Sequence, residues 1–600
     1  MILVFGGTTE GRKAAEVLEE AGTTYYYSTR GDSQRLHLVH GIRLTGGMEA
    51  AEMEECCRQN DIRLLIDAAH PFAEALHSNL LAIADRLRLP VVRYERIYPP
   101  HDGDIIWCQD YNDAIRQMET QGIRRLLALT GTNTIRRLRP FWEKHECWIR
   151  ILHREESVAM ACEADFPHDH LSFYEEEETG ALIRRLRPDA ILTKESGTSG
   201  GFNEKVKEAR KAGVRVFAVE RPPYPPRDIL PVNTHVVSVD GPHGLRRAVE
   251  RLLPSFFPLH SGLTTGTCAT AAAVAACLRL TRGETPGEVP VILPDGETIH
   301  VGVGYADGYA YVVKEAGDDP DVTDGIEIRA SVVHARKSGG LHGAETDIRG
   351  GEGVGTFTLP GFDYPPGSPA INKGPRQMIR DNLAHIAPQA ALCVTISIPQ
   401  GKEIAQRTFN PRLGIEGGIS VIGVSGIVKP FSEEAFILSI RKCMEVAKAS
   451  GTQQVVVNSG AKSERYIKAR FPQLPRQAFV EYGNYIGETL KMAGEMQFPH
   501  VTLGIMLGKA VKLAAGHLDT HSRKATFDRD FILLMLEEAH CTADISDITL
   551  ARELWHKIPS EKTRDFANVV VRHCLTVCQP LLPASRLDIL LIDDEGNIYG

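Results

Sequence analysis

The chain has 600 residues, of which 43% are hydrophobic and 24% charged, and its formal net charge is −9. At about 150 residues per domain, this length predicts roughly four folded units. The mild negative charge argues against a nucleic-acid or membrane partner, because both usually bind a basic surface. No apolar run approaches the ~18 residues that span a bilayer, and twelve scattered cysteines indicate neither a disulfide framework nor a zinc ribbon. We expect a cytoplasmic enzyme and leave a homo-oligomer open.

Short β-rich runs alternate with amphipathic helical stretches through the first 250 residues, which predicts βαβ units and parallel sheets. The predicted strands are Ile2–Phe5, Thr24–Tyr27, Leu64–Asp67, Val91–Tyr94, Leu126–Thr130, Trp148–Leu152, Ala190–Thr193 and Val214–Val219. We expect a pair of Rossmann-like domains over about 1–100 and 101–252, dividing near Pro99-Pro100. A proline-flanked linker at 253–260 follows them.

The pattern changes after this linker. An alanine-rich helix is predicted over Thr267–Leu280, and the Asp295-Gly296 and Asp307-Gly308 pairs between alternating strands predict hairpins. We expect an antiparallel α+β domain over about 261–412. From about 413 to 600, helices and strands alternate again, which predicts a further Rossmann-like α/β domain.

The first predicted strand leads directly into a glycine-rich turn and a helix. Glycines permit a tight turn, and a helix N-terminus offers N–H groups to a phosphate. Arg12-Lys13 stands where a P-loop carries Lys-Ser/Thr, so a kinase or ATPase is disfavoured. A structural βα turn without a ligand is the alternative to a dinucleotide site. The candidate cofactor residues of this turn are Gly6, Gly7, Thr8 and Thr9.

The end of the second predicted strand bears on the choice of dinucleotide. NAD sites place an acidic residue there for the ribose 2′-hydroxyl, whereas an arginine accommodates a 2′-phosphate. This chain has Arg30 and no carboxylate before Asp32. The sequence therefore favours NADPH, with NADH as the alternative.

Two further loops follow predicted strands at the sheet edge where open α/β proteins bind ligands. His70 lies in the first loop, and Lys194 and Ser196 lie in the second. We treat His70 and Lys194 as candidate catalytic residues, since a lysine neutralises a carboxylate and a histidine moves protons. A capping histidine and a solvated lysine are the alternatives.

These N-terminal motifs together resemble the precorrin-6A reductase family of cobalamin biosynthesis. They are Gly6–Arg12, Asp67–Ala73, Leu129–Gly131, Lys194–Gly201 and Glu220–Pro222. The resemblance covers about 1–250 and implies hydride transfer from a reduced nicotinamide to a double bond of a corrin precursor, in a cleft between two Rossmann-like domains. It adds Gly131 to the cofactor contacts, and makes Lys194 and Ser196 substrate contacts.

Hydroxyl and acidic residues open the second half of the chain. Thr264 and Thr265 precede the alanine-rich helix, where hydroxyls act as caps or anion cradles. Cys268 in the first turn is a candidate nucleophile, with a small packing residue as the alternative. The acidic loop that begins at Asp318-Asp319 fails the spacing of a calcium loop. Its carboxylates are candidates for positioning substrate or accepting a proton, and a solvated loop is the alternative.

The most glycine-dense segment is Gly414–Pro430, whose backbone can approach a cofactor closely. Two consecutive predicted strands then end at Asn458 and Glu481, and an acidic residue at a strand end can bind the ribose of NAD or S-adenosylmethionine. The candidate cofactor residues of this half are Gly414, Gly417, Gly418, Ser459, Gly460 and Glu481.

The second half resembles the cobalt-precorrin-5B C1-methyltransferase family across 260–600. The motifs are Thr264–Ala273, Glu315–Thr323, Ala370–Asn372, Pro375–Ile379, Gly414–Pro430, Tyr485–Gly487, Gly508–Gly516 and Thr520–Arg523. Lys373-Gly374 and Asp324 depart from the family pattern. The resemblance implies methyl transfer from S-adenosylmethionine to C1 of the macrocycle by in-line displacement. It implies substrate contacts at Thr265, Cys268, Asp321 and Arg376.

The two resemblances imply successive steps of one route: C1 methylation of cobalt-precorrin-5B, then NAD(P)H-dependent reduction of the product. The cobalt belongs to the corrinoid substrate, so we expect no metal ligands on the protein. One alternative is a nucleotide- and corrinoid-binding sensor without catalysis. The other is a generic NADP reductase fused to an unrelated methyltransferase.

Overall fold

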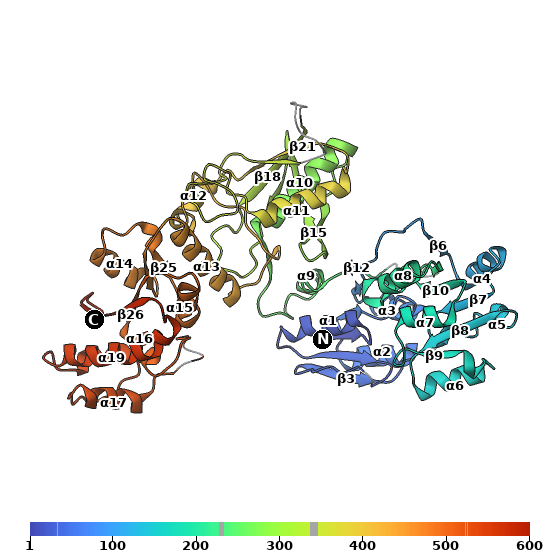
Figure 1. Cartoon of the computed structure of the whole chain (residues 1–600), viewed down its shortest axis with the longest axis horizontal. Helices are drawn as coiled ribbons and strands as arrows, with labels where there is room; N and C mark the ends of the chain where they lie inside the picture. Colours follow the sequence, from blue (N-terminus) through green and yellow to red (C-terminus); the bar gives the residue numbers. More distant parts are fainter. Residues whose placement is uncertain (33, 227–232, 336–345, 522–523, 525) are drawn as a thin grey trace. The chain divides into compact units, whose positions relative to one another are not determined.

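The computed structural model describes residues 1–32, 34–226, 233–335, 346–521, 524 and 526–600. The chain divides into two compact units (Figure 1). The first comprises Met1–His260 and Asp295–His300, and the second comprises Ser261–Pro294 and Val301–Gly600. None of the helices in these described ranges is long and apolar enough to cross a membrane. All twelve cysteines are described, and none forms a disulfide.

The first unit contains two six-stranded sheets, and every strand pair in both of them is parallel. The first has the order β12-β5-β4-β1-β2-β3. Its strands are β1 (Ile2–Phe5), β2 (Tyr25–Thr29), β3 (Gly41–Thr45), β4 (Leu64–Asp67), β5 (Val91–Tyr94) and β12 (Val236–Val239). Its helices are α1 (Thr9–Glu19), α2 (Ala50–Gln59), α3 (Glu74–Leu87) and α9 (Pro242–Leu252). Strands β1, β4 and β5 are buried at every position, as parallel strands covered on both faces must be.

The second sheet has the order β6-β11-β10-β7-β8-β9. Its strands are β6 (Ile105–Cys108), β7 (Arg125–Ala128), β8 (Glu146–Ile151), β9 (Leu171–Phe173), β10 (Ala190–Lys194) and β11 (Arg215–Val219). The accompanying helices are α4 (Tyr111–Thr120), α5 (Arg139–Trp142), α6 (Glu155–Glu163), α7 (Thr179–Leu186) and α8 (Phe202–Lys211). The predicted pair of Rossmann-like parallel-sheet domains is therefore confirmed.

The chain returns to the first sheet before it leaves the unit. Strand β12 pairs in parallel with β5, with Val236 opposite Val91, and α9 packs on both strands. The assignment of all of 101–252 to the second subdomain is therefore wrong for residues 236–252. Such a pairing joins segments about 145 residues apart (236 − 91), and local hydrophobic patterns carry no information about it.

The second unit begins with an α+β layer built on a five-stranded sheet, ordered β16-β17-β18-β21-β19. Its pairs are antiparallel except for β19–β21. The strands are β16 (Gly304–Ala306), β17 (Tyr309–Val313), β18 (Glu327–His334), β19 (Asp347–Gly350) and β21 (Leu392–Ser397). The predicted Asp295-Gly296 hairpin joins β14 (Glu288–Ile292) to β15 (Thr298–Gly302).

Helix α10 (Thr265–Arg282) is the centre of this layer. It packs against β17, β18 and α11 (Lys373–Ile386) and is buried at every position from Thr265 to Leu278. Because alanine occupies little space, neighbouring elements approach α10 from several sides. The alanine-rich sequence is thus explained by packing.

The glycine-dense segment belongs to this first layer and not to the following domain. Strand β22 (Ile415–Glu416) pairs with β20 (Thr356–Phe357), and β23 (Ile427–Val428) pairs with β13 (Gly262–Leu263). The expected boundary near 413 therefore lies too early, and the next domain starts with α13 (Glu433–Ala449). Two-residue strands show no periodicity, so the sequence pattern did not place them.

The final domain has a sheet ordered β25-β24-β26-β27-β28, parallel except for the last pair. Its strands are β24 (Gln454–Asn458), β25 (Phe479–Glu481), β26 (His500–Met506), β27 (Arg586–Ile592) and β28 (Ile598–Tyr599). The remaining helices of the unit are α12 (Gly401–Ala405), α14 (Ala461–Arg470), α15 (Ile486–Glu495), α16 (Leu507–Ala514), α17 (Arg529–Glu538), α18 (Leu554–Lys557) and α19 (Thr563–Cys578). The predicted second Rossmann-like α/β domain is confirmed.

Candidate active sites

The glycine-rich turn lies where β1 passes into α1, and its residues have different tasks. Thr8 caps α1: its hydroxyl accepts a hydrogen bond from the N–H of Gly11 at 3.0 Å and donates one to the carbonyl of Ala68 at 2.6 Å. A side chain on Gly6 would clash with the hydroxyl of Tyr27, so packing alone requires that glycine. Gly7 is left-handed at φ +88°, and no atom lies within 4 Å of the Cβ position that it lacks. The turn therefore presents an open face at Gly7.

A buried acidic side chain in this first turn ties the two sheets together. Glu10 accepts a hydrogen bond from Arg96 at 3.0 Å and another from the hydroxyl of Ser199. Arg96 also donates to the carbonyl of Ser196 at 2.7 Å. The loop after β10 is thereby fixed beside the start of α1. Neither Glu10 nor Arg96 was identified from the sequence, because nothing local links residues 86 positions apart.

The segment after β2 carries the residues that bear on the choice of dinucleotide. Arg30 follows the strand directly and is exposed. Asp32 forms an ion pair with Arg43 at 3.3 Å. The hydroxyl of Thr29 is buried and has no hydrogen-bond partner. Asp32, the carboxylate that follows this strand in the sequence, is thus paired with an arginine, while Arg30 is exposed.

His70 is held in place by a buried ionic network. Asp67 at the end of β4 lies 2.7 Å from Nδ1 of His77 and 2.9 Å from the guanidinium of Arg93. Nε2 of His77 is 3.0 Å from the carbonyl oxygen of His70. The Arg93 guanidinium and the His77 hydrogen bond hold the pKa of Asp67 below its ordinary value despite its burial. Asp67 belongs to a predicted sequence motif, but no local pattern indicates that His77 and Arg93 contact its carboxylate.

His70 itself is a neutral group in this fold. Burial, together with the positive charges of Arg96 and Lys194, lowers the pKa of His70 to about 3. Its Nδ1 accepts the N–H of Phe72 at 3.2 Å, so the ring proton resides on Nε2. His70 bonds within the loop before α3 and does not cap that helix, whose N-cap is Ala73. The Nε2–H of the neutral ring is not used in the Phe72 bond. A catalytic role stays a prediction.

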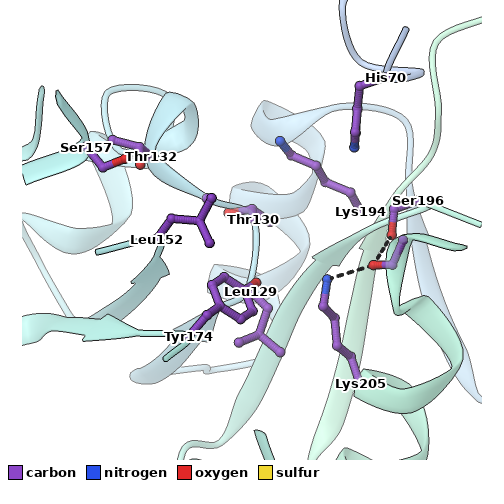
Figure 2. A pocket seen from close by; sticks show the side chains of 12 residues that line it. His70, Leu129, Thr130, Thr132, Leu152, Ser157, Tyr174, Lys194, Ser196 and Lys205 are labelled. Atoms are coloured by element: carbon purple, nitrogen blue, oxygen red, sulfur yellow. Dashed lines mark hydrogen bonds between the residues drawn. The ribbon is translucent and has the colours of Figure 1, made fainter. Parts of the chain in front are cut away.

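A cavity of about 240 Å³ lies at the carboxyl ends of the second sheet (Figure 2). It brings together four of the predicted residues and several that the sequence did not indicate. The lining residues are His70, Leu129, Thr130, Gly131, Thr132, Leu152, Ser157, Tyr174, Lys194, Ser196, Gly200 and Lys205. Burial and neighbouring positive charges lower the pKa of Lys194 to about 8, and the same causes lower the pKa of Lys205 to about 8. The site is polar, half-enclosed and electropositive.

The second unit has a comparable edge where β24, β25 and β26 end. Burial raises the pKa of Glu481, and Arg412 stands 3.7 Å from its carboxylate while contacting Glu464 at 2.9 Å. Gly460 at the end of β24 is left-handed, and its missing Cβ lies 3.3 Å from the Glu481 carboxylate. Lys509, at the start of α16, donates to the carbonyl of Gly483. Gly460 and Glu481, two of the predicted cofactor residues, therefore lie close together at this edge. Arg412 and Lys509, which the sequence did not indicate, lie near the Glu481 carboxylate.

Hydrogen bonds at the end of β24 shape the turn that contains Ser459. The N–H of Ser459 donates to the hydroxyl of Ser463 at 3.1 Å, and the N–H of Gly460 donates to the side chain of Asn458 at 3.1 Å. These bonds use the main-chain N–H groups of Ser459 and Gly460 within the turn. A cofactor contact at Ser459 stays a prediction.

The glycines of the dense loop divide into packing residues and one open position. A side chain on Gly414 would clash with Leu359, and one on Gly418 would clash with the carbonyl of Gly353. Gly417 is left-handed at φ +81° with no atom within 4 Å of its Cβ position. Packing therefore explains Gly414 and Gly418. Only Gly417 of the three has the open surface that a cofactor contact requires.

The predicted substrate contacts at the start of the second unit make structural bonds. Thr265 accepts the N–H of Ile422 at 2.9 Å. Cys268 is fully buried, which explains it as a packing residue, although reactivity stays untested. Arg376 is buried, and it donates to the carbonyls of Ile371, Ile348 and Pro369 at 2.9, 3.0 and 3.4 Å. Its guanidinium thereby joins three segments of the α+β layer.

Carboxylates of the acidic loop form ion pairs and hydrogen bonds with other residues of the protein. Asp321 pairs with the buried ammonium of Lys314 at 2.8 Å. Asp319 accepts the N–H of Phe431 at 3.1 Å, and Asp324 accepts the N–H of Ala316 at 2.8 Å. Asp318 is exposed. The loop is therefore a connecting structure, and proton transfer by Asp318 or Asp319 stays a prediction.

Lys373 and Gly374, which depart from the methyltransferase family pattern, are the first two residues of helix α11. A Cβ on Gly374 would lie 3.0 Å from the carbonyl of Gly423, so the glycine lets the dense loop pack closely on the helix. Gly266 of α10 likewise leaves room for Pro375. This departure is compatible with the local packing.

The chain is thus an α/β protein with two halves. In each half, polar side chains lie at the carboxyl ends of parallel strands. Comparison with known proteins assigns both halves. The family model CbiD matches residues 255–430, and the model described as precorrin-6x reductase CbiJ/CobK matches residues 1–240. The chain belongs to the CbiD family of methyltransferases and carries a reductase of the CbiJ/CobK family at its N-terminus.

Relatives of the second half bear the name cobalt-precorrin-5B C(1)-methyltransferase. The protein from Prosthecochloris aestuarii is 39% identical over 350 residues, which cover 56% of this chain and 94% of the relative. The protein from Brucella anthropi is 42% identical over 354 residues, 57% of this chain and 95% of the relative. Two fused enzymes of cobalamin biosynthesis, a methyltransferase and a reductase, thus account for the chain.

Two solved structures are similar to parts of the chain. The cobalamin biosynthesis protein cbiD from Archaeoglobus fulgidus is 29% identical and covers 44% of this chain and 83% of that one, with a TM-score of 0.26. A CobK precorrin-6A reductase is 20% identical and covers 42% of this chain and 97% of that one, with a TM-score of 0.35.

Proposed function

We propose that this chain methylates C1 of cobalt-precorrin-5B with S-adenosylmethionine and then reduces the product, cobalt-precorrin-6A, to cobalt-precorrin-6B with NADPH. The fusion of these two families in one chain carries the proposal, since each family supplies one of two consecutive reactions. The substrate names come from the relatives, and the residues below are assigned on their geometry. We place both reactions in the cytoplasm.

The reductase half fits a reduced dinucleotide at the end of its first sheet. The open, left-handed Gly7 and the first turn of α1 offer a place for phosphate, and the unpartnered hydroxyl of Thr29 lies at the neighbouring strand end. Arg30 is available for a 2′-phosphate. Bound NADPH would supply the hydride. On the protein side, the cavity beside Lys194 and Ser196 would orient the macrocycle, and His70 would present its Nε2–H there.

The methyltransferase half fits S-adenosylmethionine at the edge formed by Gly460 and Glu481. Glu481 is an acceptor suited to ribose hydroxyls, and glycine at 460 leaves its carboxylate accessible. Bound S-adenosylmethionine would supply the methyl group. Methyl transfer needs little covalent help, so positioning and exclusion of water are the protein's main contributions. This agrees with the structural bonds made by Thr265, Asp321 and Arg376.

Mass spectrometry of the product tests both activities at once. The full chain is incubated anaerobically with cobalt-precorrin-5B, S-adenosylmethionine and NADPH. We expect a product with one added methyl group and two added hydrogens, and only the methyl group when NADPH is left out. Reduction without prior methylation would contradict the proposed order. An unchanged substrate that nevertheless binds would favour a sensor without catalysis.

A further inference from the structure

The cavity of the reductase half contains two lysines whose charges are not neutralised. Lys194 ends β10 and Lys205 lies on α8, and both line the cavity of Figure 2. Within the part of the chain that the structure describes, neither ammonium forms an ion pair. Lys194 lies over the ring of Phe72 at 5.2 Å and Lys205 donates to a carbonyl oxygen, but neither contact supplies a negative charge. A half-buried cation without a counter-ion is unfavourable, because no opposite charge replaces its lost hydration. The site is therefore incomplete without an anion.

The surroundings of both lysines are mainly positive. Arg137 and Lys205 raise the positive potential at Lys194. Arg150 and Arg96 do the same at Lys205, where Glu204 is the one acidic neighbour among the groups that act on it. His70, which also faces Lys194, is neutral. These charges and the loss of water explain why both ammonium groups hold their protons less tightly than an exposed lysine.

Donors for an anion surround the two ammonium groups. Lys205 uses one of its three hydrogens on the carbonyl of Gly200 at 3.3 Å, which orients the side chain and leaves the others available. Ser196 donates to the same carbonyl at 3.1 Å (Figure 2). Hydroxyls of Thr132, Ser157 and Tyr174 also line the cavity. Two cations with hydroxyl donors match the two oxygens of a carboxylate.

We propose that Lys194 and Lys205 together bind one carboxylate arm of the macrocyclic substrate, and that Lys205 thereby determines how the macrocycle is oriented for reduction. A cavity of about 240 Å³ is too small for a whole tetrapyrrole and suits a single acidic side chain. Gly7, Thr8 and Arg30, the candidate phosphate contacts, are not among the residues that line this cavity. The lining therefore favours a substrate carboxylate over a cofactor phosphate. The inference rests on the proposed reductase function.

Calorimetric titration of the full chain tests this assignment directly. The probes are uroporphyrin III, a tetrapyrrole with acetate and propionate arms, and separately NADPH and inorganic phosphate. We expect Lys205→Met to weaken uroporphyrin binding at least tenfold, Lys205→Arg to restore most of it, and the double change with Lys194→Met to weaken it further. The matched control is Lys207→Met, an exposed lysine on the same helix, which should leave affinity unchanged.

The pH dependence gives a second readout that loss of packing would not produce. In the wild type, uroporphyrin affinity should fall as pH rises through about 8, where the two lysines lose their protons. This fall should disappear in the double variant. Since Met keeps the length of the lysine stem, unchanged circular dichroism is expected for each variant.

Two outcomes would overturn the assignment. If Lys205→Met weakens NADPH or phosphate and leaves uroporphyrin unaffected, the anion is a cofactor phosphate. If Lys205→Met and Lys207→Met behave alike, Lys205 binds no anion. Failure of the reductase function is distinguishable, because lysine-dependent uroporphyrin binding would then persist without any reduction by NADPH.

Discussion

Asp67 and His77 form a fully enclosed pair in which the carboxylate Oδ2 lies 2.7 Å from Nδ1 of the imidazole. The second ring nitrogen of His77 faces the carbonyl oxygen of His70 at 3.0 Å. The same carboxylate lies 2.9 Å from the guanidinium of Arg93. Through His77, Asp67 therefore fixes the main chain that carries His70.

Replacement of this carboxylate should destabilise the first unit. Asp67→Asn removes the negative charge that faces His77 and Arg93 and leaves Glu95 as the carboxylate partner of Arg93, and breaking a buried pair in this way costs about 3 kcal/mol. Three of the four tryptophans, Trp107, Trp142 and Trp148, lie in this unit. In a Trp555→Phe background, urea unfolding followed by fluorescence therefore reports this unit alone. An Asp61→Asn change at an exposed site is the control and should have no effect.

The same pair predicts a pH dependence of stability. The pKa of Asp67 is lower in the folded chain than in the unfolded one, so its contribution is complete above the unfolded pKa and is lost as pH falls through the folded pKa. The difference in unfolding free energy between wild type and Asp67→Asn should shrink between about pH 5 and pH 3. Unfolding curves of both proteins across this range measure it. A difference that stays constant would mean that Asp67 stabilises the fold by packing only.

The preference for NADPH can be tested at Arg30. Arg30→Ala removes the exposed cation at the end of β2, and we expect NADPH affinity to fall about tenfold, or 1.4 kcal/mol, while NADH affinity changes less than twofold. Fluorescence titration with each cofactor measures the two constants. Arg58→Ala on α2 is an exposed control that should affect neither. Equal losses for both cofactors would remove the argument for a 2′-phosphate contact.

The sequence predicted those features that local patterns specify. The strand β1, the turn at Gly6 and the helix α1 follow one another within 19 residues, and each has its own signal. The return of β12 to the first sheet has no such signal, because its partner β5 lies far away in the sequence. Lys205 was missed for the same reason, since a lysine on an amphipathic helix normally faces solvent. Only the packing of α8 beside β10 places it in the cavity.

The role of a motif residue is hard to predict from the sequence when the same side chain can either bind a substrate or hold the fold together. Arg376 lies in a motif with basic and proline residues that suggested substrate binding, yet its guanidinium bonds three main-chain carbonyls. Asp321 lies in an acidic motif that implied a substrate contact, and its carboxylate pairs with the buried Lys314. The type of residue defines what it can bind, whereas only the fold determines which partner is within reach.

Two adjacent glycines separate a packing role from a cofactor role. Gly418→Ala places a methyl group against the carbonyl of Gly353, so it should lower the stability of the second unit by at least about 2 kcal/mol. Gly417→Ala meets no neighbouring atom and adds only the strain of a left-handed alanine, about 1 kcal/mol. We expect Gly417→Val to abolish S-adenosylmethionine binding in a folded protein. Calorimetry that shows normal affinity for Gly417→Val would exclude the loop from the cofactor site.

Two substitutions at Glu481 distinguish the contribution of its negative charge from that of its hydrogen-bond acceptors. Glu481→Gln keeps one carbonyl acceptor and removes the charge, so S-adenosylmethionine affinity should fall about tenfold, whereas Glu481→Ala should cost about a hundredfold because no acceptor is left. Burial raises the pKa of Glu481, so the wild-type affinity should also decline on acidification, and this decline should be absent in Glu481→Gln. Isothermal titration at several pH values measures both effects, with exposed Glu488→Gln on α15 as the control. Reduction of added cobalt-precorrin-6A should continue unchanged in all three variants, since Glu481 belongs to the second unit. If Glu481→Ala binds S-adenosylmethionine like the wild type, the methyl donor binds elsewhere, and the pairing of Glu481 with Arg412 is structural.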